Sequence, residues 1–219
     1  KKMQDAAENV HKMRAVVGDK VDLLIELHRR LTPAEAVTFT NLIKDDNPMF
    51  VEDPIRPENA DAMARVADRI AVPIATGERF FTIYEFQALL SRNALEYVRV
   101  DVAVCGGITG AKKVAAMAEA HNCQVVPHNP LSPVGLAACL QIAAAIPNFA
   151  IQEYATGFEA GEFTSTIEHL GANIVDHVPE VKDGFVDIPT GPGLGVNVLD
   201  NAQSIRPPFV QPISMRLHK

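Results

Sequence analysis

Short apolar runs alternate with longer segments of helical periodicity over residues 1–153 of the chain. The apolar runs have the length of strands, and in the segments between them apolar positions recur every three to four residues. This pattern predicts helices over residues 1–17, 33–44, 57–70, 82–92, 108–121 and 133–146, and strands over residues 21–26, 49–52, 73–78, 97–101, 124–128 and 149–153.

The predicted strands are apolar throughout rather than polar at every second position. Strands of this kind, each followed by a helix, are typical of a parallel sheet that helices cover. A doubly wound open sheet and a closed barrel both satisfy the pattern.

The ends of the predicted strands favour the barrel. Each strand finishes on a carboxylate or a histidine, and a barrel brings the carboxyl ends of all its strands to one mouth. An open sheet would use only a few strand ends at its switch point. The six terminal residues are Glu26, Glu52, Glu78, Asp101, His128 and Glu153.

After residue 153 the alternation stops, and the chain becomes rich in glycine and proline. Residues 184–188 and 195–198 are short strand candidates there. We assign residues 1–200 to a catalytic (β/α) barrel domain and residues 201–219 to an extended C-terminal segment.

Charge and composition narrow the classes of partner. The chain has a formal net charge of −7, which disfavours nucleic-acid binding, and its apolar runs are too short to span a membrane. Its 3 cysteines show no metal-binding or disulfide spacing, as expected in the reducing cytosol. We therefore expect a cytoplasmic protein with a small-molecule partner.

Three of the strand-terminal residues are glutamates at equal spacing, namely Glu26, Glu52 and Glu78. Carboxylates that converge at one mouth repel one another unless a cation lies among them. Oxygen ligands suit Mg²⁺, with Mn²⁺ as the alternative, better than zinc. The neighbouring Asp53 is interpreted as a residue that supports the ligands or as a loop cap, rather than as a fourth ligand.

Asp101 and His128 end adjacent predicted strands and form a candidate catalytic pair. An aspartate that accepts from one ring nitrogen leaves the other nitrogen as a proton acceptor. Strand alternation places His28 on the same face as Glu26, where it is a candidate acid. Arg99 shares the face of Asp101 and either pairs with acids in the barrel, which we favour, or contacts substrate.

Together these motifs resemble the enolase superfamily, in its mandelate racemase-like branch, and most closely the galactonate-type sugar-acid dehydratases. The resemblance runs in unbroken order from about residue 5 to residue 200. It is carried by Glu26–His28, Phe50–Pro54, Gly77–Arg79, Asp101 with Gly106–Thr109, Pro127–His128, Gln152–Glu153 and Pro192–Gly195.

The resemblance implies a function for each of these residues. It implies Mg²⁺ at the three glutamates, the Asp101–His128 pair as the base that removes the proton α to a carboxylate, and His28 as the acid that assists loss of the β-hydroxyl. Glu153 would stabilise the enolate. The residues that would contact substrate are Arg99, Glu78, His128 and Glu153.

Two features depart from the galactonate dehydratase pattern. The first metal position is usually aspartate in that family, whereas here it is Glu26. Arg99 and the stretch Leu31–Pro33 are similar to mannonate dehydratases, which lack the Asp–His pair. The sequence is also compatible with a racemase or epimerase of the same superfamily, and with a non-catalytic barrel that binds acid sugars.

The resemblance also sets expectations for the whole protein. It implies a (β/α)7β barrel, an α+β capping domain that governs substrate choice, and a symmetric homo-oligomer, often an octamer. Counting strands, we expect the chain to lack the first two barrel strands and the cap. Such a chain would leave a sheet edge unpaired and be poorly stable or inactive alone.

Overall fold

A computed structural model describes residues 2–130, 132–156, 158–159, 162–163 and 169–207. The chain divides into two compact units. The larger unit comprises Lys1–Asn129 and Ala138–Tyr154, and the smaller comprises Pro130–Ala137 and Ala155–Lys219. The candidate site residues from Glu26 to Glu153 all belong to the larger unit.

The larger unit contains a 5-stranded parallel sheet in which each strand pairs with the next one along the chain. The register aligns Glu26 with Glu52, and this places two of the predicted ligands side by side. The strands are β1 (Leu24–Glu26), β2 (Phe50–Glu52), β3 (Ile74–Thr76), β4 (Tyr97–Val98) and β5 (Gln124–Val125).

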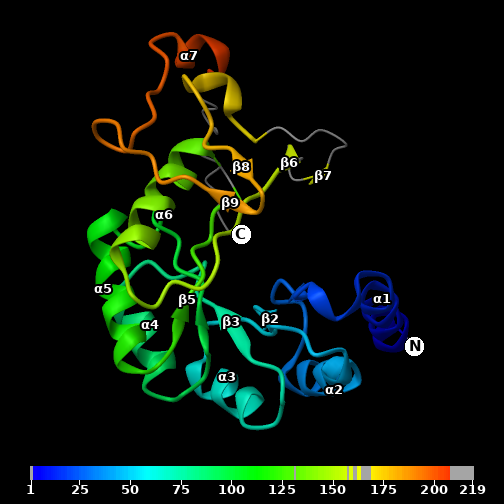
Figure 1. Ribbon diagram of the computed structural model, residues 1–219. Helices are drawn as coiled ribbons and strands as arrows, with labels where there is room; N and C mark the ends of the chain where they lie inside the picture. The colour runs from blue at the N-terminus through cyan, green and yellow to red at the C-terminus, as the bar shows by residue number, and fades with distance from the viewer. Residues whose placement is uncertain (1, 131, 157, 160–161, 164–168, 208–219) are drawn as a thin grey trace, which may run out of the picture. The chain divides into compact units, whose positions relative to one another are not determined.

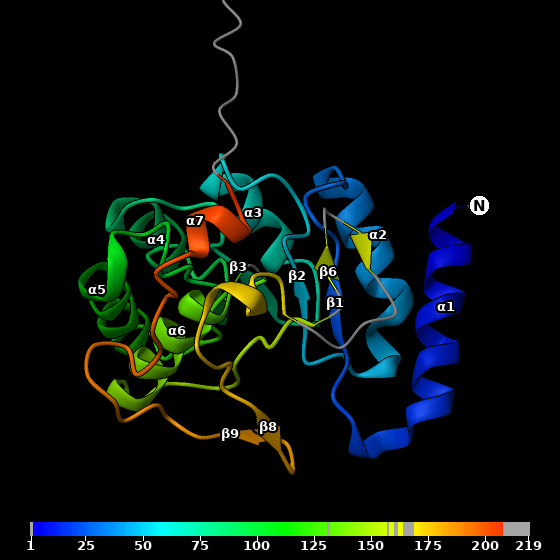
Figure 2. The ribbon, with the colours of Figure 1, turned by 90° about the horizontal axis from the view of Figure 1, so that it is seen from above.

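Helices connect these strands and pack against one another in sequence order, from α1 on α2 to α4 on α5. Seen from above, they follow one another around the sheet (Figure 2). Their bounds are α1 (Lys2–Val17), α2 (Pro33–Ile43), α3 (Ala60–Ala67), α4 (Ile83–Leu90), α5 (Gly107–Ala120) and α6 (Pro133–Ala145), with the short 3₁₀ helices η1 (Gly18–Lys20) and η2 (Lys44–Asp46).

This arrangement distinguishes the two predicted folds. A doubly wound sheet reverses its strand order and places helices on both faces, whereas β1 to β5 run in sequence order without reversal. Right-handed connections between such strands place successive helices on one side of the sheet (Figure 1). The predicted parallel, barrel-type architecture is therefore confirmed.

Local sequence explains where the helices begin. Thr32 caps α2, Pro33 occupies its first position, and the Glu35 carboxylate accepts from the Thr32 backbone N–H at 2.8 Å. Glu85 accepts from Thr82 N–H in the same way at the start of α4. These caps fix the loops that follow β1 and β3, where candidate site residues lie.

The interior of the sheet is packed with apolar side chains. Phe50, Ala75 and Val126 form a buried cluster, and the Phe50 and Tyr97 rings lie 5.2 Å apart. The helices contribute further buried side chains such as Met63 and Phe86. This packing makes the sheet a rigid base for the polar groups at its carboxyl edge.

The sixth predicted strand, over residues 149–153, is wrong as a strand. Phe149 forms an isolated parallel bridge with Val125, and Ala150 N–H donates to Val125 C=O at 2.9 Å. The ladder then ends, and Ile151 is 45% exposed. Among the described residues this segment has no further strand partner, so its apolar side chains find no second face to bury against.

The smaller unit contains short elements. In the hairpin of β8 and β9, Asp183 and Gly184 both have positive φ, as a two-residue turn of this kind requires. The candidate strand over residues 195–198 is reduced to a bridge between Val175 and Val198. The elements are β6 (Phe158–Glu159), β7 (Glu162–Phe163), η3 (Ala172–Ile174), β8 (Val181–Lys182), β9 (Phe185–Val186) and α7 (Ala202–Ile205).

The predicted extended segment over residues 201–219 is helical at its beginning, where α7 lies, and residues 208–219 fall outside the described part. Within the described part, no helix is both long and apolar enough to cross a membrane.

Candidate active site

Three carboxylates meet at the carboxyl edge of the sheet. Glu26 and Glu52 are the last residues of β1 and β2, and Glu78 follows β3. One oxygen from each of the three lies within 4.8 Å of the others. The structure thus brings together the residues that the sequence predicts as metal ligands.

Gly77 makes the turn that leads to Glu78. Its φ is +139°, and a Cβ at this position would lie 2.6 Å from Phe86 Cε1 and 3.2 Å from the Arg99 carbonyl oxygen. Only glycine fits both the backbone conformation and the space. The Gly-Glu pair is therefore a structural requirement for placing the third carboxylate.

The environment of the three carboxylates favours a cation. The pKa of Glu26 is raised to about 8, because its carboxyl group is packed among protein atoms and faces the charges of Glu52 and Asp53, although the residue as a whole is exposed. Burial also raises the pKa of Glu52, and Arg99 only partly offsets this. Hard oxygen ligands whose charges repel one another fit Mg²⁺ or Mn²⁺.

Asp101 and His128 form the predicted pair. His128 Nδ1 lies 2.8 Å from Asp101 Oδ2, and Ala103 N–H donates to the other Asp101 oxygen at 2.8 Å. The second ring nitrogen, Nε2, lies 3.1 Å from Glu78 Oε2. The imidazole is thus oriented by Asp101, with Nε2 directed at the carboxylate triad.

These contacts shift the pKa values of His128 and Glu78 in the directions that favour an ion pair between them. Burial lowers the pKa of His128, but hydrogen bonds to Asp101 and Glu78 outweigh it and raise the pKa to about 9. Burial raises the pKa of Glu78, yet His128 and Arg29 lower it to about 2. Both shifts have the direction expected of an ion pair between the imidazole and the Glu78 carboxylate.

Arg99 crosses the interior of the sheet and pairs with two acids. Its Nε donates to Glu52 Oε1 at 2.5 Å, and its Nη2 donates to Glu153 Oε2 at 2.7 Å. Its Nη1 donates to the carbonyl oxygens of Val126 and Pro127. Arg99 is only 3% exposed, so the structure favours the pairing role over the predicted substrate contact.

Glu153 reaches the site from the extended segment after α6. One of its oxygens accepts from Arg99 and also from Asn129 N–H at 2.7 Å. The hydrogen bonds hold Glu153 beside Glu52 without a strand. Its position at the mouth is as predicted, although the element that carries it is not.

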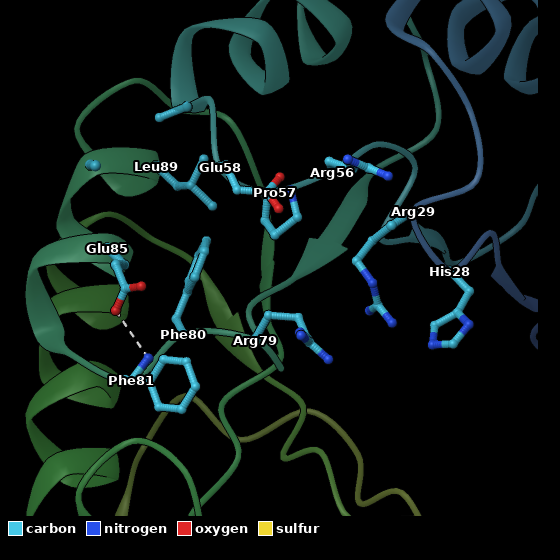
Figure 3. A pocket seen from close by; sticks show the side chains of 12 residues that line it. His28, Arg29, Arg56, Pro57, Glu58, Arg79, Phe80, Phe81, Glu85 and Leu89 are labelled. Atoms are coloured by element: carbon cyan, nitrogen blue, oxygen red, sulfur yellow. Dashed lines mark hydrogen bonds between the residues drawn. The ribbon is translucent and has the colours of Figure 1, made fainter. Parts of the chain in front are cut away.

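His28 does not lie in a strand, so the alternation argument for it is wrong. Strand β1 ends at Glu26, and His28 lies in a turn with a φ of +49°. Its backbone N–H donates to Glu26 Oε1, while its exposed side chain lines a cavity of about 740 Å³ (Figure 3). His28 therefore lies near Glu26, as expected, but a turn rather than the strand places it there.

Arg29 and Asp53 form a clamp beside the triad; sequence reasoning considered Asp53 as a supporting residue but missed Arg29 and the contact between the two. Arg29 Nη1 contacts both Asp53 Oδ2 and Glu78 Oε1. Asp53 is 1% exposed and accepts from the Thr76 hydroxyl at 2.5 Å. Both residues have positive φ, at +63° and +44°, which concentrates backbone strain beside the triad. The available signal was their place in the loops after β1 and β2, where Asp53 is the first residue and Arg29 the third.

Comparisons with known proteins agree with this geometry. Residues 1–202 match the family described as enolase C-terminal domain-like. D-galactonate dehydratases from Ralstonia nicotianae and Variovorax paradoxus are each 34% identical over 198 residues, which cover 88% of this chain and 50% of those proteins. The chain spans about half the length of the curated relatives it matches.

Solved structures of related enzymes also resemble this chain. The mandelate racemase/muconate lactonizing enzyme from a Sulfitobacter species is 36% identical, with a TM-score of 0.80 over 90% of this chain and 47% of that one. The resemblance to the mandelate racemase-like branch, and within it to galactonate-type dehydratases, is thereby confirmed. The chain belongs to the enolase C-terminal domain-like family.

Proposed function

We propose that this chain carries the metal-ligand and base residues of a Mg²⁺-dependent sugar-acid dehydratase. The observation that carries the proposal is the position of His128, which Asp101 orients and which directs Nε2 toward the triad of Glu26, Glu52 and Glu78. The D-galactonate dehydratases among its relatives support an aldonic acid such as galactonate or gluconate as substrate.

The three glutamates would hold the metal ion. A bound Mg²⁺ supplies positive charge that offsets the negative charge developing on the substrate carboxylate. Glu26 is one methylene longer than the aspartate usual in this family, but its oxygen reaches the other two carboxylates. Arg99 holds Glu52 from within the sheet, and Arg29 holds Glu78 from the loop after β1.

His128 would remove the proton from C2, with Nε2 as the accepting atom and Asp101 stabilising the imidazolium that forms. The electron pair of the broken C2–H bond first moves into the carboxylate, which gives an enediolate, and then forms a double bond between C2 and C3. The C3–O bond breaks, and the departing hydroxyl takes up a proton and leaves as water. The resulting enol becomes a 2-keto-3-deoxy acid.

His28 would deliver the proton to the departing hydroxyl, since its side chain is exposed beside Glu26 and can meet a bound ligand. Glu153, fixed by Arg99 and Asn129, would contact the developing charge through a water molecule. Both assignments rest on position at the mouth, whereas that of His128 also rests on its contact with the triad.

The test is product formation by the longest natural protein that contains this chain. A panel of aldonic acids in D₂O with Mg²⁺ is followed by NMR for 2-keto-3-deoxy product and for deuterium at C2. Product with one aldonate, and none after His128→Asn, supports the proposal. Exchange at C2 without loss of water supports a racemase instead, and neither signal with any acid in the metal-loaded protein contradicts both.

Two expectations about the whole protein stay proposals. Three unpaired cysteine thiols support a location in the reducing cytosol. A symmetric homo-oligomer, with an octamer as the expected form, is measured directly by the mass of the protein in solution, and a monomer would contradict it.

A further inference from the structure

Two adjoining cavities open on the loops that follow β1, β2 and β3, beside the candidate active site. Their volumes are about 740 Å³ and 590 Å³, and Arg29, Arg56 and Glu58 line both of them. All of the lining residues lie in the larger unit. The proposed catalytic roles use only His28 and Arg29 of this lining, so the remainder has no assigned task.

Arginine dominates the charge of these cavities. Arg29, Arg30, Arg56 and Arg79 line them, and no lysine does. The acidic residues of the lining are Glu58, which offsets one of these charges, and Glu85, whose carboxylate is taken up by the backbone N–H groups of Phe81 and Thr82. The two cavities together, called the recess below, are thus rich in arginine although the net charge of the chain is −7.

The four arginines are not equivalent. Arg29 is held by Asp53 and Glu78, so its charge is neutralised within the protein. Arg56 and Arg79 are exposed, and within the described part of the chain their side chains form no ion pair or hydrogen bond. Figure 3 shows Arg29 and Arg79 directed into the same open space. Arg56 and Arg79 are therefore the guanidinium groups of the larger cavity that are available to a ligand, whereas Arg30, also exposed, lines only the smaller cavity.

The lining also has an apolar side. Phe80 is buried, whereas Phe81 is 65% exposed at the cavity wall. Planar guanidinium groups bind carboxylate and phosphate oxygens in pairs, and apolar walls beside them strengthen such contacts by excluding water. The combination suits an anionic group on a short carbon skeleton better than a free simple ion.

Arg79 directly follows Glu78, and His28 lines the larger cavity while its backbone contacts Glu26. The recess therefore lies directly beside the carboxylate triad. A small molecule held in the recess at one end could reach the triad with the other, and a separate anion could also occupy the recess by itself.

From this arrangement we propose that the recess is an anion-binding subsite, in which Arg56 and Arg79 bind a carboxylate or phosphate group. The subsite is separate from the metal ligands, and its existence does not depend on the proposed dehydration. The same chemistry serves a second anionic group of the substrate or an independent small anion.

The test is calorimetric or NMR titration with inorganic phosphate at low ionic strength, in EDTA so that no metal-bound phosphate contributes. The double variant Arg56→Gln/Arg79→Gln is compared with Arg69→Gln, which removes an exposed arginine outside both cavities. We expect binding to weaken about tenfold or more in the double variant and to be unchanged in the control. Thermal unfolding checks that both variants fold.

Two further titrations identify the source of the anion. Galactarate, with a carboxylate at each end, is compared with D-galactonate in the presence of Mg²⁺. Tighter binding of galactarate that disappears in the double variant assigns the subsite to the substrate's own second anionic group. Phosphate binding that is unchanged by saturating D-galactonate assigns it to an independent anion.

The proposal is overturned if phosphate and galactarate bind the wild type no better than the double variant. A protein that binds phosphate through the two arginines but dehydrates no aldonate keeps the subsite and loses the proposed function. The two proposals can therefore fail separately.

Discussion

His128 Nε2 and Glu78 Oε2 lie 3.1 Å apart, so the ring nitrogen that would accept the substrate proton faces one of the proposed metal ligands. Asp101 fixes the opposite ring nitrogen at 2.8 Å, and Arg29 holds the other Glu78 oxygen. The base and the metal site are thus coupled through one carboxylate. A change at Glu78 is expected to affect both.

Divalent metal binding should depend on the three converging glutamates. We expect Glu52→Gln to weaken Mn²⁺ binding about tenfold or more, because it removes one charged oxygen ligand. Electron paramagnetic resonance of free Mn²⁺ measures this directly. Glu119→Gln, on the exposed face of α5, is the matched control and should leave the affinity unchanged. Equal affinity in both variants would show that the cluster holds no metal.

Arg99 should be essential for stability because two acids depend on it. Arg99→Met leaves Glu52 and Glu153 without their partner in the sheet interior, and loss of one member of a buried ion pair costs about 3–5 kcal/mol. Urea unfolding measures the loss. Arg99→Lys keeps the charge but not the forked geometry and should lose less. A methionine variant as stable as wild type would refute the pairing role.

Replacing Gly110 by alanine should have the opposite effect on stability from the one usual within a helix. Replacing a helical glycine by alanine ordinarily stabilises by roughly 0.5–1 kcal/mol. Here a Cβ would lie 2.0 Å from the Cys105 carbonyl oxygen, so Gly110→Ala should destabilise the protein by about 1–3 kcal/mol. Thr109→Ala, on the exposed side of α5, should change stability little. Thermal unfolding of both variants decides the sign.

The three cysteines should react slowly near neutral pH. Burial raises the pKa of the Cys105 and Cys123 thiols to about 11 and that of Cys139 to about 12. Since the thiolate is the reactive form, its fraction at pH 8 is about a thousandth or less, and labelling should accelerate as pH rises toward 11. Mass spectrometry after iodoacetamide treatment measures this. Rapid labelling of the native protein at pH 8 would contradict the burial.

The sequence predicts the helices closely because their caps and periodicity are local signals. Five of the predicted strands occur but are shorter than expected, since their ends depend on hydrogen bonds to neighbouring strands. The segment over residues 149–153 has the same apolar pattern yet forms only one bridge, at Phe149. Strand formation there requires a partner surface that local sequence cannot specify.

The residues of the site also divide into those that local sequence predicts and those that depend on contacts between distant parts of the chain. Glu26, Glu52, Glu78, Asp101 and His128 were predictable because one polar residue ends each apolar run. Arg29 and its contacts with Asp53 and Glu78 were missed because they arise from positive φ and from approaches across 24 and 49 residues of chain. The position of His28 was reached by a wrong argument, since the strand ends two residues earlier.

Deuterium exchange at C2 of D-galactonate, with Mg²⁺ in D₂O, tests the central claim most directly, because it isolates proton removal from the later loss of water. Our account predicts exchange in the wild type and a loss of about 10²–10⁴-fold in His128→Asn, with Mn²⁺ binding retained. Exchange that proceeds equally fast without the His128 imidazole would contradict the assignment of the Asp101–His128 pair as the base.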